Sequence, residues 1–229
     1  MKVEFASNDD IVIFRVRDFS SPIEEALKMC FYQKDGDSYI KNFPASTPYM
    51  DKIMAHYEKY AEEMFLQLVY QRPIPWEKGL LEFLKRIDHS NVDWWLTGSC
   101  AACIRGININ PHDVDMMVDS QSIGVIIELF KDNIIEPIID TKGWVTKDFG
   151  VLFMQCRIDI ASDPQSSLDE PEPVDCGPYA KSKLETVIWN GYKVRIPPIE
   201  LQLNANKRRQ RTERVRRIEE YMNSRKLSA

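Results

Sequence analysis

Residues 94–119 constrain the fold of this chain more than any other stretch. An apolar run at residues 92–96 leads into Gly98-Ser99, and the small residues that follow favour the start of a helix. Beyond a turn, Asp113-Val114-Asp115-Met116-Met117-Val118 alternates with the period of a strand. The two aspartates are separated by one residue, so on a strand they point to the same face. Like charges so close together are costly unless a cation or a substrate binds them.

The composition is that of an ordinary soluble protein. The chain has 229 residues, of which 44% are hydrophobic and 28% charged, enough for one larger domain or two small ones. No apolar run approaches the roughly 18 residues of a membrane helix, and the first residues show no signal-peptide core. We therefore expect a cytoplasmic protein that does not enter a membrane. Five cysteines without a secretion signal predict reduced thiols and no disulfides.

Three general functions, namely redox chemistry, zinc binding and nucleic-acid binding, receive little support from the sequence. Cys100-Ala-Ala-Cys103 has the spacing of a redox motif. A zinc site would need further ligands, but the three histidines are scattered along the chain and no second cysteine pair exists. The simplest interpretation is two small side chains on the buried side of a helix. The net charge of −5 does not favour general nucleic-acid binding, although Lys and Arg residues crowd residues 207–217.

Two domains are predicted. Residues 1–72 form a small α+β module, with strands at 3–5, 11–16 and 39–43 and a long amphipathic helix that begins near Thr47-Pro48. Its stripe of aromatic and Met residues is typical of a core or an interface, and no chemistry can be assigned to it. Arg72-Pro73-Ile74-Pro75 reads as a linker. Residues 76–229 form the second domain.

The second domain has an α/β pattern, in the broad sense that includes α+β. Helices are predicted at 76–87 and 123–130, with strands at 92–96, 113–118, 156–160 and 192–196. Residues 144–146 and 151–154 are predicted to flank a hairpin turn at 147–150, residues 161–178 form a loop, and 183–188 are either helical or extended. The expected fold is a short mixed sheet backed by helices, with a helical C-terminus.

A third acid completes a candidate site. Asp159 lies in the alternating segment Ile158-Asp159-Ile160, where a lone aspartate would be read as solvent-facing. With Asp113 and Asp115 on a neighbouring strand, however, three carboxylates can hold two divalent cations about 3.5–4 Å apart. Gly98-Ser99 at a helix start offers N–H groups and a hydroxyl to phosphate oxygens.

These motifs resemble those of a known superfamily. Gly98-Ser99, thirteen further residues, Asp113-Val114-Asp115-Met116 and then Ile158-Asp159-Ile160 resemble the signature of polymerase-beta-type nucleotidyltransferases. The residues around Trp94-Trp95, Arg105-Gly106 and Pro111-His112 are most similar to the aminoglycoside and lincosamide nucleotidyltransferases. The resemblance covers about residues 76–222, and residues 1–72 lie outside it.

The resemblance implies a set of roles. Asp113 and Asp115 would bind Mg²⁺ or Mn²⁺, and Asp159 would complete the metal site or act as the general base. The nucleotide-binding residues would be Gly98, Ser99, Arg105 and Lys207. The implied reaction transfers a nucleoside monophosphate, with AMP from ATP as the expected case, to an acceptor hydroxyl and releases pyrophosphate. The acceptor, a small molecule, a protein side chain or an RNA end, is not specified.

The sequence also departs from the family pattern. Thr97 replaces an apolar residue, Ser99 replaces a glycine, and residues 106–111 lack an Arg-Thr or Arg-Pro pair that is common in the antibiotic enzymes. The alternative reading is a noncatalytic or antitoxin-like protein that uses the same fold to bind a partner. A protein partner of the N-terminal module also stays open.

Overall fold

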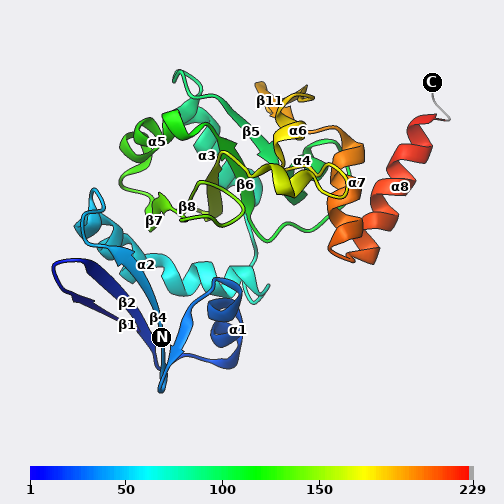
Figure 1. The fold of residues 1–229 in the computed structure, drawn as a ribbon. Coiled ribbons are helices and arrows are strands. Elements are labelled where there is room, and N and C mark those ends of the chain that lie inside the picture. The colour runs from blue at the N-terminus through cyan, green and yellow to red at the C-terminus, as the bar shows by residue number, and fades with distance from the viewer. Residues whose placement is uncertain (227–229) are drawn as a thin grey trace.

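The computed structural model describes residues 1–226, so the last residues of the predicted second domain, 227–229, lie outside it. Three sheets and the helices around them make up this part of the chain (Figure 1). None of the helices in residues 1–226 combines the length and the apolar character needed to cross a membrane. All five cysteines are free thiols.

An antiparallel sheet in the order β1-β2-β4-β3 forms the N-terminal module. Every second residue of β2 is buried, because the sheet has one face toward the helices and the other toward solvent. Phe14 on that buried face packs edge-on against Tyr57, which comes from the long helix. The elements of this module are β1 (Lys2–Ser7), β2 (Ile11–Arg17), α1 (Ser21–Met29), β3 (Gln33–Asp35), β4 (Ser38–Pro44) and α2 (Met50–Leu68).

The central sheet is mixed, with the order β5-β6-β9-β8-β7. Strands β6 and β9 are parallel, and the other neighbours are antiparallel. Helices α2, α3 and α5 pack against this sheet, and α2 lies between it and the N-terminal sheet (Figure 1). The elements are α3 (Trp76–Ile87), β5 (Trp94–Thr97), α4 (Gly98–Ile104), β6 (Val114–Val118), η1 (Ser120–Ser122), α5 (Ile123–Phe130), β7 (Ile134–Asp140), β8 (Asp148–Met154) and β9 (Cys156–Ser162).

The C-terminal part of the chain packs beside β5 and α4. A two-stranded hairpin packs beside β5, and α7 contacts both α4 and α8. Ile218 of α8 is buried against Ala102 and Ile107, which fastens the last helix to the α4 region. The elements are η2 (Ser166–Asp169), α6 (Pro178–Lys181), β10 (Glu185–Trp189), β11 (Tyr192–Ile196), α7 (Ile199–Arg208) and α8 (Thr212–Lys226).

The mixed α+β architecture agrees with the predicted fold class, but one predicted hairpin is wrong. Residues 147–150 are not a turn; β8 begins at Asp148, and its hairpin with β9 turns at Gln155, which has a positive φ of 68°. Gly150 suggested a turn, yet a Cβ there would lie 2.4 Å from the Cα of Ile138. The glycine thus serves the close approach of β7. The undecided residues 183–188 mostly fall in strand β10.

One hydrophobic cluster of buried residues extends through both predicted domains. A buried polar contact joins them as well. Glu136 of β7 accepts a hydrogen bond from the Tyr32 hydroxyl at 2.9 Å and pairs with Lys41 at 2.6 Å. Both partners of Glu136 come from the N-terminal module. Whether residues 1–72 fold as a separate unit stays a prediction.

Candidate active site

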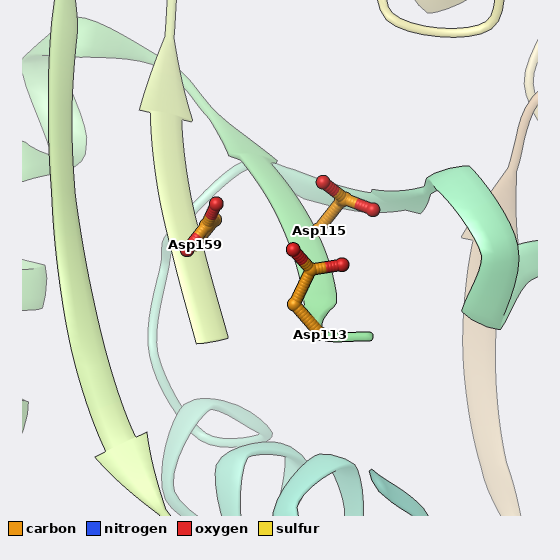
Figure 2. Close-up of side chains that lie close together, drawn as sticks. All are labelled: Asp113, Asp115 and Asp159. Atoms are coloured by element: carbon orange, nitrogen blue, oxygen red, sulfur yellow. The ribbon is translucent and has the colours of Figure 1, made fainter. Parts of the chain in front are cut away.

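Three aspartates meet where the start of β6 lies beside the middle of β9 (Figure 2). Asp115 and Asp159 are direct partners in the parallel register of these strands, so their side chains stand on the same face. Asp113 precedes β6 by one residue and lies below Asp115 in the figure. One carboxylate oxygen from each residue lies within 4.8 Å of the other two. The structure thus brings together the acids that the sequence singled out.

Gly98 allows the chain to turn immediately beside Asp115. Its φ is +65°, in the left-handed region that favours glycine, and a Cβ would lie 2.0 Å from Asp115 Oδ2. The N–H of Gly98 donates to Asp175 Oδ2 at 3.2 Å, and the Thr97 hydroxyl donates to the Asp175 carbonyl at 2.8 Å. A buried carboxylate therefore holds the glycine turn. Sequence reasoning missed Asp175 because residues 161–178 read only as an acidic loop.

The two cysteines of the Cys-x-x-Cys segment help to shape the loop that carries Asp113. The Cys100 thiol donates to the Asp113 carbonyl at 3.2 Å, and the Cys103 thiol donates to the Ile109 carbonyl at 3.0 Å. Burial raises the pKa of both thiols, so neither is a reactive thiolate. Their role is structural, in line with the simpler sequence interpretation.

A buried arginine clamps the third acid. Arg157 lies two residues before Asp159 on β9, and its Nε is 2.6 Å from Asp159 Oδ1. The same guanidinium donates to Cys30 Sγ at 3.2 Å, a contact with the N-terminal module. Arg157 is buried, and its apolar neighbours in the sequence gave no signal that it would pair with the acid.

The electrostatics of the site favour a bound cation. Burial raises the pKa of Asp159 to about 6, with Arg157 lowering it and Asp113 raising it. Burial also raises the pKa of Asp115, and the charges of Asp113, Asp159 and Asp175 push it the same way. A divalent cation would relieve this repulsion. Carboxylate oxygens are hard ligands of the kind that Mg²⁺ and Mn²⁺ prefer.

A cavity of about 270 Å³ opens over the three acids. Arg209, Arg211 and Arg214 line it on one side, from the end of α7 to the start of α8. The N-terminal module lines it as well, with Phe31 and Lys41 among its contributions. Residues that the sequence left without chemistry therefore reach the candidate active site.

Two of the four predicted nucleotide-binding residues lie away from the cavity. Ser99 lines the cavity, but Lys207 and Arg105 do not. Lys207 pairs with Glu219 of α8 at 3.2 Å, and Arg105 pairs with Glu185 of β10 at 2.6 Å. The basic run was visible in the sequence. Which of its members face the cavity depends on the turn between α7 and α8, which periodicity does not specify.

A comparison with protein-family models matches residues 79–151 to the aminoglycoside-2''-adenylyltransferase family. This segment contains the Gly98-Ser99 turn, Asp113 and Asp115. The resemblance to nucleotidyltransferases is confirmed. The matched segment includes the turn and two of the three clustered acids, so the family model supports the enzyme class that the sequence predicted.

Solved structures of nucleotidyltransferases resemble the chain more distantly. A protein of Thermotoga maritima described as a nucleotidyltransferase has 19% identity and a TM-score of 0.47, over 63% of this chain and 91% of its own. The lincosamide antibiotic adenylyltransferase LnuA, bound to lincomycin, has 15% identity and a TM-score of 0.46, over 62% and 96%. ANT(2'')-Ia, in complex with adenylyl-2''-tobramycin, has 14% identity and a TM-score of 0.40, over 65% and 90%. A search of curated protein sequences found no match.

Proposed function

We propose that this protein transfers AMP from ATP to an acceptor hydroxyl, with a divalent metal bound mainly by Asp113 and Asp115 and with Asp159 as the general base. The observation that carries the proposal is the in-register pair Asp115 and Asp159, completed by Asp113 at the floor of one cavity. A paired acid face beside a glycine turn has few structural uses, because it stores like-charge repulsion. ATP is the proposed donor since the matched family model describes an adenylyltransferase.

The donor set fits Mg²⁺ or Mn²⁺. Three carboxylates provide only oxygen ligands. Burial raises the pKa of Asp115 and Asp159, and the negative charge of Asp113 raises both further, which a bound cation would offset. When bound, the metal would offset the charge of the triphosphate and orient its oxygens. Arg157 already compensates part of the charge of Asp159, so Asp113 and Asp115 are the main proposed ligands.

Arginines on the α7–α8 turn are suited to the triphosphate. Burial lowers the pKa of Arg211, and so do the neighbouring charges of Arg214 and Arg209. Such a cluster of cations is stabilised by an anion. We therefore assign triphosphate binding to Arg209, Arg211 and Arg214 in place of Lys207. The Gly98 N–H is committed to Asp175, so this glycine contributes mainly by letting the backbone pass beside Asp115.

Asp159 is the proposed general base. Its pKa of about 6 suits a carboxylate that must accept a proton near neutral pH. As the acceptor oxygen bonds to the α-phosphorus, the bond from that phosphorus to the bridging oxygen breaks and pyrophosphate leaves. The hydroxyl proton passes to Asp159. Arg157 fixes the orientation of this carboxylate through the 2.6 Å contact.

Calorimetry with Mg²⁺ and a non-hydrolysable ATP analogue tests the metal–nucleotide site. In Asp113→Asn/Asp115→Asn the affinity is expected to fall by more than about 100-fold, because even changes behind metal ligands cost 10–100-fold. The matched control is Asp9→Asn/Asp10→Asn, two exposed acids in the β1–β2 turn, which should leave the affinity unchanged. Equal binding by the wild type and the Asp113/Asp115 variant would contradict the proposal.

A further inference from the structure

The cavity has two chemically different sides. Arg209 and Arg211 line the cavity on the Asp115 side: Arg209 lowers the pKa of Asp115, and Asp115 raises the pKa of Arg211. The Asp159 side has Arg157 as its close cation, and Cys30 connects it to the loop that follows α1. That loop carries Phe31, which also lines the cavity. If the arginine side takes the triphosphate, the acceptor occupies the side that Phe31 lines.

Exposed apolar side chains gather on this acceptor side. Among residues 1–226, nine large hydrophobic residues are conspicuously exposed, and four of them line this one cavity: Met29, Phe31, Trp144 and Val145. Phe31 is the most exposed of all, at 72%, and Trp144 is 43% exposed. Their rings meet edge-to-face with centroids 5.9 Å apart, although they belong to different modules. We call these four residues the aromatic corner.

Two features hold the aromatic corner open. Phe31 has a φ of +61° because it caps α1: its N–H donates to the Lys28 carbonyl, and the Tyr32 N–H donates to the Leu27 carbonyl, which fixes the backbone that carries the ring. Trp144 packs edge-on against Phe149 of β8 at 5.5 Å, which supports its ring from the side of the central sheet. Large exposed apolar surface of this kind is unfavourable in water and is typical of a ligand-binding site.

The charges of the acceptor side exclude a polycation. Asp159 is the carboxylate there, and Arg157 already pairs with it. Lys41 adds a further cation, whose partner Glu136 is 1% exposed and does not line the cavity. The fourth acid of the cavity, Asp175, accepts the Gly98 N–H on the opposite side. Because Glu136 and Asp159 already pair with Lys41 and Arg157, this side has no unpaired carboxylate for an acceptor with several ammonium groups.

We propose that the acceptor is an uncharged hydroxyl compound that carries a flat apolar ring, and that this ring packs on the aromatic corner formed by Met29, Phe31, Trp144 and Val145. The proposal rests on the proposed function, because it assumes that the arginine side binds the nucleotide. It also separates this protein from the aminoglycoside-modifying proteins whose family model it matches. In this protein the N-terminal module, which supplies Met29 and Phe31, helps to select the acceptor.

Binding of three probes tests the acceptor class. Saturation-transfer NMR and calorimetry would compare phenyl β-D-glucopyranoside, methyl β-D-glucopyranoside and tobramycin in buffer of about physiological ionic strength, which screens surface charge. The phenyl glucoside is expected to bind most tightly, with its ring protons receiving the strongest transfer. The methyl glucoside has the same sugar without the ring and is expected to bind at least tenfold more weakly. Tobramycin, a polycation, is expected to bind most weakly of the three.

Variants of the aromatic corner provide the second arm. Phe31→Ala/Trp144→Ala should weaken the phenyl glucoside about tenfold, the size expected for two aromatic contacts. Ile188→Ala removes another exposed apolar side chain, 64% exposed on β10 outside the cavity, and should change nothing. Both variants alter surface residues, and unchanged Mg²⁺–ATP analogue binding would show that the nucleotide side is intact.

Three results would overturn the proposal: tighter binding of tobramycin than of the phenyl glucoside, no preference for the ring, or no effect of Phe31→Ala/Trp144→Ala. These failures are distinguishable from failure of the proposed function. If Asp113→Asn/Asp115→Asn bound the ATP analogue normally, the nucleotide assignment would fall whatever the glucosides did. If that variant lost the nucleotide while tobramycin bound best to the wild type, only the acceptor inference would fall.

Discussion

The two sides of the cavity are built in different ways. On the Asp115 side, strand register, a glycine turn and a buried acid set the positions of the reacting groups. On the acceptor side, exposed rings from two modules meet across a loop. The first arrangement is fixed by backbone geometry and tolerates little change. The second depends on side chains and can change with little effect on the sheet.

This difference separates chemistry from selectivity. The proposed transfer reaction requires its metal ligands and its base at fixed distances, and neighbouring strands of the central sheet position Asp115 and Asp159, two of the residues proposed for these roles. The acceptor has only to be held with its hydroxyl near Asp159, and loops can provide that. Mutations on the Asp115 side should therefore abolish transfer, whereas those on the acceptor side should change which acceptor is used.

The largest effect is expected from Gly98→Ala. The added methyl would lie 2.0 Å from Asp115 Oδ2, at a backbone φ of +65° that disfavours any Cβ. AMP transfer should fall by more than about 100-fold, since displacements of about 1 Å cost that much in an active site. Gly191→Ala is the matched control, because Gly191 also has a positive φ, +85°, but open space around it. Gly191→Ala is expected to lower stability slightly and to leave Mg²⁺–ATP analogue binding and transfer intact.

Comparable transfer by Gly98→Ala and Gly191→Ala would remove the distinction between the two sides. It would show that the position of Asp115 adjusts easily to a neighbouring methyl group. Thermal unfolding of both variants separates this outcome from misfolding, because the cost of a positive φ alone is about 1–2 kcal/mol in each.

Much of the Asp115 side could be predicted from the sequence. Asp113-x-Asp115 shows the period of a strand, and Asp159 lies in a second alternating segment, so local patterns were enough to propose that they share a face. Their pairing required only that β6 and β9 be neighbours, as they are. Asp175 was missed because only the folding of the chain brings it to Gly98. Arg157 was missed because its pairing with Asp159 depends on burial, which a single sequence does not show.

The acceptor side could not be predicted, for a physical reason. Phe31 and Trp144 are 113 residues apart, and neither lies in a periodic segment that would indicate its environment. Gly150 was also misleading, because a glycine required by the nearby β7 backbone resembles a glycine required by a turn. Lys207 was chosen from a basic run whose orientation depends on the helix boundary at residues 208–212. Local patterns specify elements better than they specify contacts between elements.

A smaller effect is expected from Glu136→Gln, which tests how the acceptor side is held in place. The substitution removes the charge that faces Lys41 and should destabilise the protein by about 3 kcal/mol, as expected when a buried ion pair loses one partner. Burial raises the pKa of Glu136, but the charges of Lys41 and Arg157 outweigh it, and the net pKa lies below its ordinary 4.5. The stabilisation is therefore fully present above pH 4.5 and is lost as pH falls through the lowered pKa.

Chemical denaturation between pH 7 and pH 3 would measure this difference. The free energy of unfolding of the wild type should exceed that of Glu136→Gln by a constant amount above pH 4.5, and the gap should narrow below it. Glu128→Gln, an exposed acid on α5, is the control and should lower the free energy of unfolding far less than Glu136→Gln does. A gap that widened toward acid pH would contradict the assigned direction of the Glu136 pKa.

The smallest effect is expected from a single arginine on the nucleotide side. Arg211→Ala should weaken Mg²⁺–ATP analogue binding about tenfold, the size of one charge-assisted contact, and the loss should diminish as salt is added. Lys207→Ala is the matched control: this lysine lies four residues earlier, pairs with Glu219 at 3.2 Å and does not line the cavity. Calorimetry at low and high salt would measure the affinity of both variants for the Mg²⁺–ATP analogue and show which of the two side chains contributes to it. If Lys207→Ala weakened binding more than Arg211→Ala, the nucleotide would lie along α7, and the division of the cavity into an arginine side and an aromatic side would have to be redrawn.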